Sequence, residues 1–428
     1  MIETDVAVVG AGPAGTAAAV TLAGLGLRVT LLDRARFPRD KCCGDGLTTA
    51  ALRHLEELGL DPAGVASWQP VREAWIRVPN GQQAGFPLPD DGTLYAASAQ
   101  RLDLDAALVA LARQRGVDVL EGRALCRAEL EPGGEVVRLG FEDGTRVRAW
   151  YAIGADGMWS PLRKLLGLGE PGYLGEWHAV RQYFEGAGPL ARKLWVWFEP
   201  DLIPGYAWSF PLPDGRVNVG FGVQRRPGHS TGQLKAQWAD VLTRPHIVEV
   251  LGREIRPDGP WKAWPIPARI SRNPLSGWDG RVLFVGDAAR AADPMTGEGI
   301  AQALETGRLA GEVIAAAGPD RPDRAARRYR RGIAAGMTVD DRASRLLSRI
   351  LADPRTAGAA LRLADHSPRT RAHFARWMFE DYPRAVFVTP HRWSRGALHR
   401  LGAFQPDSKP APEPEPEPAA NSPEASRS

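Results

Sequence analysis

Cysteine is scarce in this chain of 428 residues: it holds three, and two of them, Cys42 and Cys43, are adjacent. So few cysteines exclude the framework of several disulfide bonds that holds small secreted domains together. Acids at Glu3 and Asp5, with no basic N-terminal segment, predict that no secretory signal is present. No apolar run approaches the roughly 20 residues that a membrane-spanning helix needs. We therefore expect an intracellular protein, either free in the cytoplasm or resting on the inner face of the cell membrane.

A surplus of charge is also lacking, because 54 Lys and Arg residues face 50 Asp and Glu residues and the net charge is +4. Binding to nucleic acid would need the basic residues concentrated on one face, so we expect no nucleic-acid partner. The eight histidines are scattered, and no H-E-x-x-H motif, paired C-x-x-C motif or Ser-His-Asp order stands out. We therefore expect neither a metal site nor a nucleophilic triad.

Glycine is abundant, and the segment VVGAGPAG at 8–15 arranges three glycines as G-x-G-x-x-G between a strand-like and a helix-like run. Gly10, Gly12 and Gly15 permit a tight turn, close backbone approach to a pyrophosphate and close helix packing. Asp33 ends the next buried strand, where a carboxylate can accept hydrogen bonds from ribose hydroxyls. The unit predicts a dinucleotide site.

A second chemistry-bearing segment lies far downstream. A buried strand, Val282 to Val285, leads into Gly286 and Asp287, a turn rich in Pro and Gly, and a helix expected from about Gly299. An acid at a strand end can bind a sugar-alcohol chain, and a helix N-terminus can stabilise negative charge on a flavin ring. A bound NAD alone would not need this second site, which favours a flavin dinucleotide.

Three segments together resemble the FAD fingerprints of the p-hydroxybenzoate hydroxylase-like flavoprotein class: GAGPAG at 10–15, GADGMWSPLRKLLG at 154–167 and VGDAARAADPMTGEG at 285–299. Arg101, at the head of an expected helix, matches the arginine or glutamine that this class places at the flavin. The cofactor is therefore expected to be FAD. The resemblance implies cofactor-binding roles for Gly10, Gly12, Ala14, Gly15, Asp33, Arg34, Cys43, Gly44, Arg101, Asp156, Gly157, Gly286, Asp287, Gly297, Gly299 and Ile300.

Two further motifs resemble one branch of that class, the geranylgeranyl reductase family. KCCGDGL at 41–47 is similar to its K-x-C-G-[GD]-G-[LI] segment, with Cys43 on the family cysteine. IPGYAWSFP at 203–211 is similar to its substrate-pocket motif P-x-x-Y-x-W-x-F-P, with one residue fewer after Pro204. The resemblance implies an enzyme that reduces C=C bonds of isoprenoid chains such as geranylgeranyl groups, polyprenyl lipids or menaquinone side chains.

The same resemblance suggests how the reaction is divided among residues. Hydride delivery from a reduced flavin to an alkene needs an apolar slot and a proton source. Cys43 is the expected catalytic residue, and the expected substrate-binding residues are Gly46, Tyr206, Trp208, Phe210 and Pro294. With only one G-x-G-x-x-G, no second Rossmann unit for NAD(P)H is evident, so the electron donor stays open among NADPH, NADH and a reduced carrier protein.

Three alternative functions stay open. An FAD-dependent aromatic monooxygenase would use the same cofactor fingerprints, and a non-catalytic flavin-binding or lipid-carrier protein would keep them without turnover. A halogenase is a weaker alternative, because Trp195, Trp197 and Pro200 echo the W-x-W-x-I-P motif without its ending. Alternating Trp-Val-Trp is also typical of a half-buried strand.

The cysteine pair also has structural alternatives. Consecutive Cα atoms lie about 3.8 Å apart, below the roughly 4.4 Å minimum usual for disulfides, so a Cys42–Cys43 bond would be strained. By the resemblance, Cys42 fills a variable motif position, and Cys43 shapes the pocket or assists protonation.

Apolar patterning changes along the chain. Strand and helix patterns alternate over the first 165 residues, strands follow one another from about 170 to 278, and 322–404 is mainly helical. We predict an α/β fold: a Rossmann-like FAD-binding domain with an inserted, mostly antiparallel β-sheet substrate domain and a helical C-terminal region. The predicted boundaries are 1–70, 98–168 and 279–345 for the FAD-binding domain, 71–97 and 169–278 for the substrate domain, 346–404 for the helical region and 405–428 for a disordered tail.

The C-terminal end is unusual in composition. Residues 405–428 contain no large apolar residue and are dominated by Pro, Glu, Ser and Ala, which predicts disorder. The preceding segment 390–404 mixes Arg and His with Trp, Leu and Phe. It predicts either a terminal helix docked on the protein or a peripheral contact with an anionic membrane. The oligomeric state is left open.

Overall fold

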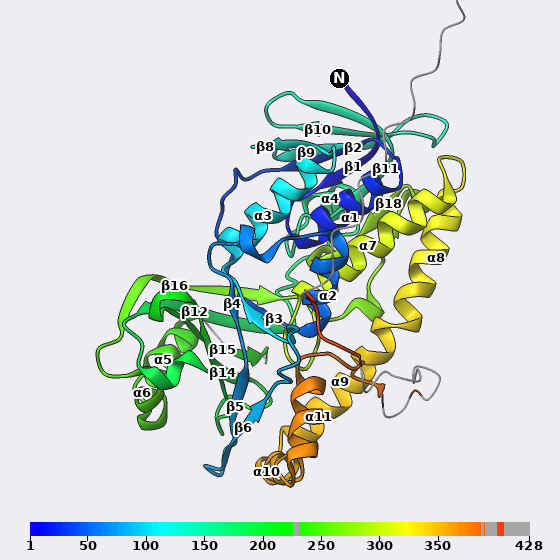
Figure 1. Ribbon diagram of the computed structural model, residues 1–428. Helices are drawn as coiled ribbons and strands as arrows, with labels where there is room; N and C mark the ends of the chain where they lie inside the picture. Colours follow the sequence, from blue (N-terminus) through cyan, green and yellow to red (C-terminus); the bar gives the residue numbers. More distant parts are fainter. Residues whose placement is uncertain (226–230, 387–388, 390–399, 406–428) are drawn as a thin grey trace, which may run out of the picture.

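The first sheet contains the predicted Rossmann-like unit (Figure 1). The computed structural model describes residues 1–225, 231–386, 389 and 400–405. Eight of the described strands form this sheet, in the order β17-β18-β11-β1-β2-β8, with β10 and β9 continuing from β11. They are β1 (Ile2–Val9), β2 (Val29–Asp33), β8 (Asp118–Glu121), β9 (Leu125–Leu130), β10 (Val137–Phe141), β11 (Arg146–Gly154), β17 (Ser276–Gly277) and β18 (Val282–Phe284). β1 pairs in parallel with both β2 and β11, as expected when a crossover helix joins β1 to β2.

The core of this unit depends on close contact between two helices and the sheet. Residues 4–9 and 29–33 are buried without alternation, because helices cover both faces of a parallel sheet. α1 (Pro13–Gly24) consists largely of small residues and packs against α7 (Ile300–Ala317). A Cβ atom on Gly307 would lie only 2.1 Å from the carbonyl oxygen of Ala14. The two helices therefore approach to backbone contact, which a side chain at 307 would prevent.

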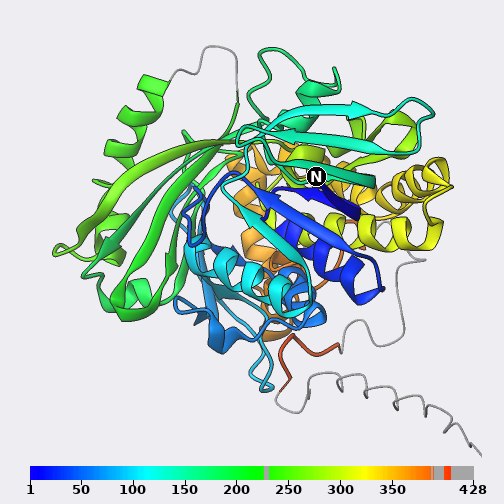
Figure 2. The same ribbon diagram turned by 90° about the horizontal axis from the view of Figure 1, so that it is seen from above.

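The second sheet is the predicted, mostly antiparallel insertion, and it stands beside the first (Figure 2). Its described strands run in the order β16-β12-β15-β14-β13-β5-β6. They are β5 (Glu73–Arg77), β6 (Gln83–Pro87), β12 (Trp177–Glu185), β13 (Leu194–Trp197), β14 (Tyr206–Pro211), β15 (Val217–Gln224) and β16 (Arg256–Ile266). Only the β13–β5 pair among them is parallel.

The two faces of the second sheet carry different aromatic residues, because successive side chains of a strand point to opposite faces. Trp195 and Trp197 of β13 are buried in a core with α5 (Thr231–Val241) and α6 (Pro245–Leu251). Tyr206, Trp208 and Phe210 alternate along β14 with residues of that core and face the other way. The Trp-Val-Trp segment therefore behaves as a strand with one face in a core.

The remaining elements connect and cover the sheets. A small sheet is formed by β3 (Gly46–Leu47), β7 (Ala97–Ser98) and β4 (Gln69–Pro70). The other helices are α2 (Thr49–Leu58), α3 (Arg101–Gln114), α4 (Pro161–Leu165), α8 (Pro322–Ala335), α9 (Met337–Leu351), α10 (Pro354–Ala364) and α11 (Pro368–Met378). α11 packs against β6, so the C-terminal helices close the end of the second sheet. Within the described ranges, none of the helices has the length and apolarity needed to cross a bilayer.

The predicted fold class is confirmed: a Rossmann-like FAD-binding fold, an inserted antiparallel sheet and a helical C-terminal region are all present. The domain boundaries remain predictions. Most of the basic and aromatic segment at 390–404 and all of the tail after residue 405 lie outside the described residues, so the predictions for them are not tested.

The contact between α1 and α7 can be tested by substitution. Gly307→Ala should lower the free energy of unfolding by about 1–3 kcal/mol, because the added methyl group overpacks the interface. Gly24→Ala is the matched control: it lies in α1 with no atom within 4 Å of the added group, so its effect should be neutral or slightly stabilising. Urea unfolding measures both. Equal stability changes in the two variants would contradict the close contact.

Candidate functional site

A cavity of about 790 Å³ lies where the two sheets meet the N-termini of α1 and α7. It is lined by almost all the residues that the sequence analysis assigns to cofactor and substrate. These are Gly10, Gly12, Ala14, Asp33, Arg34, Cys43, Gly44, Gly46, Arg101, Asp156, Gly157, Tyr206, Trp208, Phe210, Gly286, Asp287, Gly297, Gly299 and Ile300. Gly15 and Pro294 do not line it. Pro294 borders a smaller cavity of about 350 Å³, and its carbonyl oxygen accepts a hydrogen bond from the Trp177 indole.

The glycine-rich turn after β1 has the shape that a pyrophosphate requires. Gly10 has a φ of +104°, and a Cβ atom on it would lie 2.3 Å from the Ala155 carbonyl oxygen. A Cβ on Gly15 would lie 1.8 Å from the Gly10 carbonyl oxygen, so Gly15 serves packing of the turn rather than the cavity wall. A Cβ on Gly12 would meet only two guanidinium nitrogens, 3.6 and 3.8 Å away. The space before the α1 N-terminus is therefore open and flanked by cations.

These cations belong to Arg39 and Arg101, which share one carboxylate. Arg101 donates two hydrogen bonds of 2.7 Å to the Asp105 carboxylate, and Arg39 lies 2.9 Å from it. Arg101 and Asp105 are almost fully buried. Two guanidinium groups against one carboxylate leave a net positive charge beside Gly12. Together with the helix N-terminus, this charge suits a diphosphate.

Two of the three acids predicted to bind the cofactor also fix the local backbone. Asp33 accepts hydrogen bonds from the backbone N–H groups of Ala11 at 2.7 Å and Ala35 at 2.8 Å, so its carboxylate ties β2 to the glycine turn. Each carboxylate oxygen has a second lone pair, which leaves room for a ribose hydroxyl. Asp156 accepts from the N–H of Leu162 in the first turn of α4 at 2.8 Å and from the hydroxyl of Ser160, the N-cap of that helix, at 2.6 Å. The predicted cofactor contacts of both acids stay predictions.

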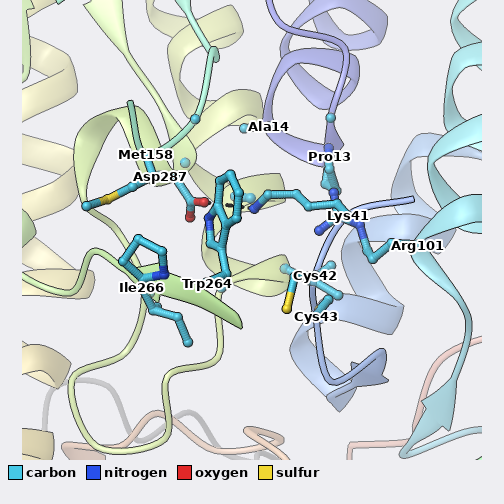
Figure 3. Close-up of a pocket in the computed structure, with 18 of the residues that line it drawn as sticks. Pro13, Ala14, Lys41, Cys42, Cys43, Arg101, Met158, Trp264, Ile266 and Asp287 are labelled. Atoms are coloured by element: carbon cyan, nitrogen blue, oxygen red, sulfur yellow. Dashed lines mark hydrogen bonds and ion pairs between the residues drawn. The ribbon is translucent and has the colours of Figure 1, made fainter. Parts of the chain in front are cut away.

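An ion pair crosses the cavity on the opposite side. Lys41 reaches to Asp287, with Nζ 2.9 Å from a carboxylate oxygen, and the Trp264 ring lies beside the pair (Figure 3). The N-terminus of α7 borders the same region. There the Glu298 carboxylate accepts a hydrogen bond of 2.9 Å from the N–H of Ile300, and burial raises the pKa of Glu298 to about 7. Asp287 and the N-terminus of α7 line the cavity, and their predicted roles toward the sugar chain and the flavin ring stay predictions.

The cysteine pair lies in a segment that leads from the cofactor side of the cavity toward the second sheet (Figure 3). Both thiols are free. Burial raises the pKa of the Cys43 thiol to about 11, with the nearby Asp45 carboxylate adding to the shift. Burial likewise raises the pKa of Cys42 to about 12, and its thiol contacts the Lys262 carbonyl oxygen. Both side chains therefore keep their protons at neutral pH.

Tyr206, Trp208 and Phe210 of β14 line the same cavity as Cys43 and form its aromatic wall, and Phe198 continues the row of rings beyond the cavity lining. Phe198, Tyr206, Trp208 and Phe210 follow one another with ring centroids 5.9, 5.9 and 6.0 Å apart. A Cβ atom on Gly46 would lie 2.8 Å from the Phe210 ring, so the glycines around Cys43 allow the segment to approach this wall. The result is an apolar surface beside the segment that carries Cys43.

The residues present therefore fit FAD on the cofactor side of the cavity. A diphosphate, a ribose, a sugar-alcohol chain and a flavin ring each find the donor, acceptor or helix N-terminus that their chemistry needs. The described part of the chain contains no group of three or more His, Cys, Asp or Glu side chains arranged to hold a metal ion.

Several residues of the cavity were not assigned a role from the sequence. Lys41 and Asp45 belong to the cysteine motif, and Trp264 comes from β16. The sequence holds a signal for Lys41 and Asp45, because both are charged residues within the cysteine motif. Trp264 carried no signal that separates it from the tryptophans of the core.

Gly12 provides a test of the cofactor site. Gly12→Val should place a side chain where the diphosphate is expected and weaken FAD binding by at least about tenfold, or 1.4 kcal/mol. The fold should survive, because the nearest atoms are ends of flexible arginine side chains. Gly64→Ala, with no atom within 4 Å of the added group, should bind FAD normally. Flavin absorbance per protein and far-UV circular dichroism give the two readouts, and stoichiometric FAD in Gly12→Val would contradict the assignment.

Known proteins resemble this chain over most of its length. The family described as an FAD binding domain matches residues 3–329. The chain is 34% identical over 340 residues to a menaquinone reductase of Mycolicibacterium smegmatis, covering 74% of this chain and 77% of that protein. It is 33% identical over 327 residues to digeranylgeranylglycerophospholipid reductase 2 of Methanopyrus kandleri, covering 74% and 78%.

A solved structure has the same fold. It is a geranylgeranyl bacteriochlorophyll reductase-like protein from Thermoplasma acidophilum, with a TM-score of 0.75 and 23% identity over 92% of this chain and 100% of that one. The match of fold, the cofactor-binding family and the two sequence relatives agree with the motifs around Cys43 and Trp208. The chain belongs to the geranylgeranyl reductase family of FAD-dependent oxidoreductases.

Proposed function

We propose that this protein reduces C=C bonds in isoprenoid chains, such as geranylgeranyl groups, polyprenyl lipids or a menaquinone side chain. The observation that carries the proposal is a single cavity whose cofactor side fits FAD and whose lining also includes the successive aromatic rings of Tyr206, Trp208 and Phe210. Relatives named for the reduction of prenyl-bearing compounds support the substrate class. The electron donor is NADPH, NADH or a reduced carrier protein.

The aromatic row binds the chain and orients one double bond. Tyr206, Trp208 and Phe210 present ring faces and edges to the cavity, and apolar contact is the main interaction available to a hydrocarbon. Tyr206 is held in place because its hydroxyl donates a hydrogen bond to the Thr296 carbonyl oxygen. The Tyr206 ring is uncharged, so it can lie against a hydrocarbon chain without the cost of desolvating a charge.

Reduction of an alkene needs a hydride and a proton. Bound FAD, when reduced, supplies the hydride. Cys43 supplies the proton: its thiol stays protonated at neutral pH, and the residue lines the same cavity as the cofactor residues and the aromatic rings of β14. Cys42 has a different place, since its thiol turns to the Lys262 carbonyl oxygen.

The reaction is tested with purified holoenzyme, a reductant and prenyl substrates of several lengths. Product mass should rise in steps of two hydrogens, and the reaction should proceed without dioxygen. A product that gains an oxygen atom, with dioxygen consumed in equal amount, would move the protein to the monooxygenases. Absence of turnover on every prenyl compound, with FAD bound and reduced, would favour a carrier.

Substitution of each cysteine in turn tests whether Cys43 alone takes part in the reaction. Cys43→Ala should retain FAD and lower the rate of reduction by about 10²-fold or more, the usual contribution of a positioned acid. Cys42→Ala should change the rate by less than about threefold, since its thiol contacts a backbone oxygen outside the aromatic wall. Product formation and flavin absorbance are measured for both variants. Equal rates in the two variants would refute this division.

A further inference from the structure

Asp45 is a buried carboxylate that the proposed reaction has not yet used. Its residue has no exposed surface, and its backbone adopts a φ of +64°, a conformation that Asp tolerates better than most side chains. Three groups donate hydrogen bonds to its carboxylate: the Tyr183 hydroxyl at 2.6 Å, the Asn218 side-chain amide at 2.8 Å and the backbone N–H of Arg101 at 3.3 Å. A carboxylate buried this completely needs such partners, and all three come from other elements.

The hydrogen bonds tie Asp45 to both sides of the site. Asn218, fully buried on β15, also donates to the Cys43 carbonyl oxygen at 2.9 Å and accepts from the Trp208 indole at 3.1 Å. One amide thus joins the cysteine segment to the aromatic wall. Asp45 completes this network on the cysteine side.

Asp45 also contacts the Cys43 thiol through its backbone, and Arg101 and Glu298 are further charged neighbours of that thiol. The backbone N–H of Asp45 points to the Cys43 sulfur at 3.4 Å, closing a tight turn between the two residues. A hydrogen bond from this N–H favours a thiolate, whereas the Asp45 carboxylate opposes it. The protonation states of the two side chains are therefore coupled.

The charges that face Asp45 come from three elements. Arg181 and Tyr183 approach from β12, Arg101 from the start of α3, and Cys43 from the same segment. Arg181 is itself paired with Asp40 at 2.6 Å and lies over the Tyr183 ring. Despite the donors and cations, complete burial raises the pKa of Asp45 to about 6.

We propose that Asp45 is the internal acid that returns a proton to Cys43 after each reduction. The proposal rests on the proposed function. In the step, a hydride forms the bond to one alkene carbon, and the π electrons take the thiol proton to form the second C–H bond. The thiolate then takes the proton of the Asp45 carboxyl group, and the carboxylate regains a proton that comes ultimately from solvent.

A pH dependence follows. Asp45 holds its proton below about pH 6 and loses it as the pH rises through that value. The rate of reduction should therefore fall on the alkaline side of pH 6. Tyr183 donates to the ionised carboxylate and so lowers the pKa of Asp45, which means that Tyr183→Phe should move this fall to higher pH.

The experiment uses holoenzyme in a Cys42→Ala, Cys126→Ser background, so that only Cys43 remains for alkylation. Two proteins are compared, the background variant that keeps Asp45 and the same variant with Asp45→Asn. Their alkylation by iodoacetamide is followed by mass spectrometry at pH 6–10 without substrate. Removal of the carboxylate charge should move the alkylation profile to lower pH by about one unit, a tenfold rate increase at fixed pH. Turnover of the same variant should fall by at least tenfold, and its alkaline limb near pH 6 should disappear.

Asp91→Asn is the matched control, because Asp91 also accepts a tyrosine hydroxyl, that of Tyr95 at 2.7 Å, but does not line the cavity. It should change neither profile. If Asp45→Asn does not fold, the shift of the alkaline limb in Tyr183→Phe decides in its place.

Other results of the alkylation and turnover experiments would overturn separate parts of the proposal. An unmoved alkylation profile in Asp45→Asn would show that the two groups are not coupled, and a moved profile with wild-type turnover would exclude proton return by Asp45. A wild-type protein that alkylates as expected but reduces no prenyl compound would overturn the proposed function, and the proton transfer with it, while leaving the coupling established.

Discussion

The site depends on the anchoring of one short, partly covered segment, residues 39–46, to the second sheet, and within it Asp45 is fully buried. Its acids reach the second sheet: Asp40 pairs with Arg181, and Asp45 accepts from Tyr183 and Asn218. Asp45 needs its hydrogen-bond donors, because a fully buried carboxylate without them would cost several kcal/mol. The same segment carries Lys41 and Cys43 into the cavity. The segment therefore forms part of the same cavity wall as the cofactor residues and the aromatic rings of β14.

The cofactor side is built from backbone rather than from long side chains. Glycines let α1 and α7 pack at backbone distance, and both helices then direct their N-termini at the same cavity. Helix N-termini offer unpaired N–H groups and a partial positive charge, which suits a dinucleotide diphosphate and a flavin ring. Arg39 and Arg101, sharing Asp105, add charge to the diphosphate end. The hydrocarbon side needs no such charge, and there the glycines serve instead to bring Cys43 close to the rings.

Features encoded by neighbouring residues could be predicted from the sequence. Strand, glycine turn and helix follow one another along the chain, so the fold class and the cavity residues of the three fingerprints could be predicted. Contacts between distant segments could not. The Lys41–Asp287 pair and the network around Asp45 join residues far apart in the chain, and no spacing encodes them. Alternation along β13 predicted two faces but not which one meets α5 and α6, and Pro294 points its carbonyl oxygen at Trp177 instead of lining the cavity.

If one cavity holds reduced FAD and a prenyl double bond at the same time, electrons pass directly from the flavin to the chain. Anaerobic single-turnover mixing of reduced holoenzyme with a prenyl substrate tests this most directly, with flavin reoxidation followed by absorbance. We expect the flavin to be reoxidised without dioxygen, with one flavin oxidised for each double bond saturated. A flavin that stays reduced beside its substrate until dioxygen is admitted would contradict it.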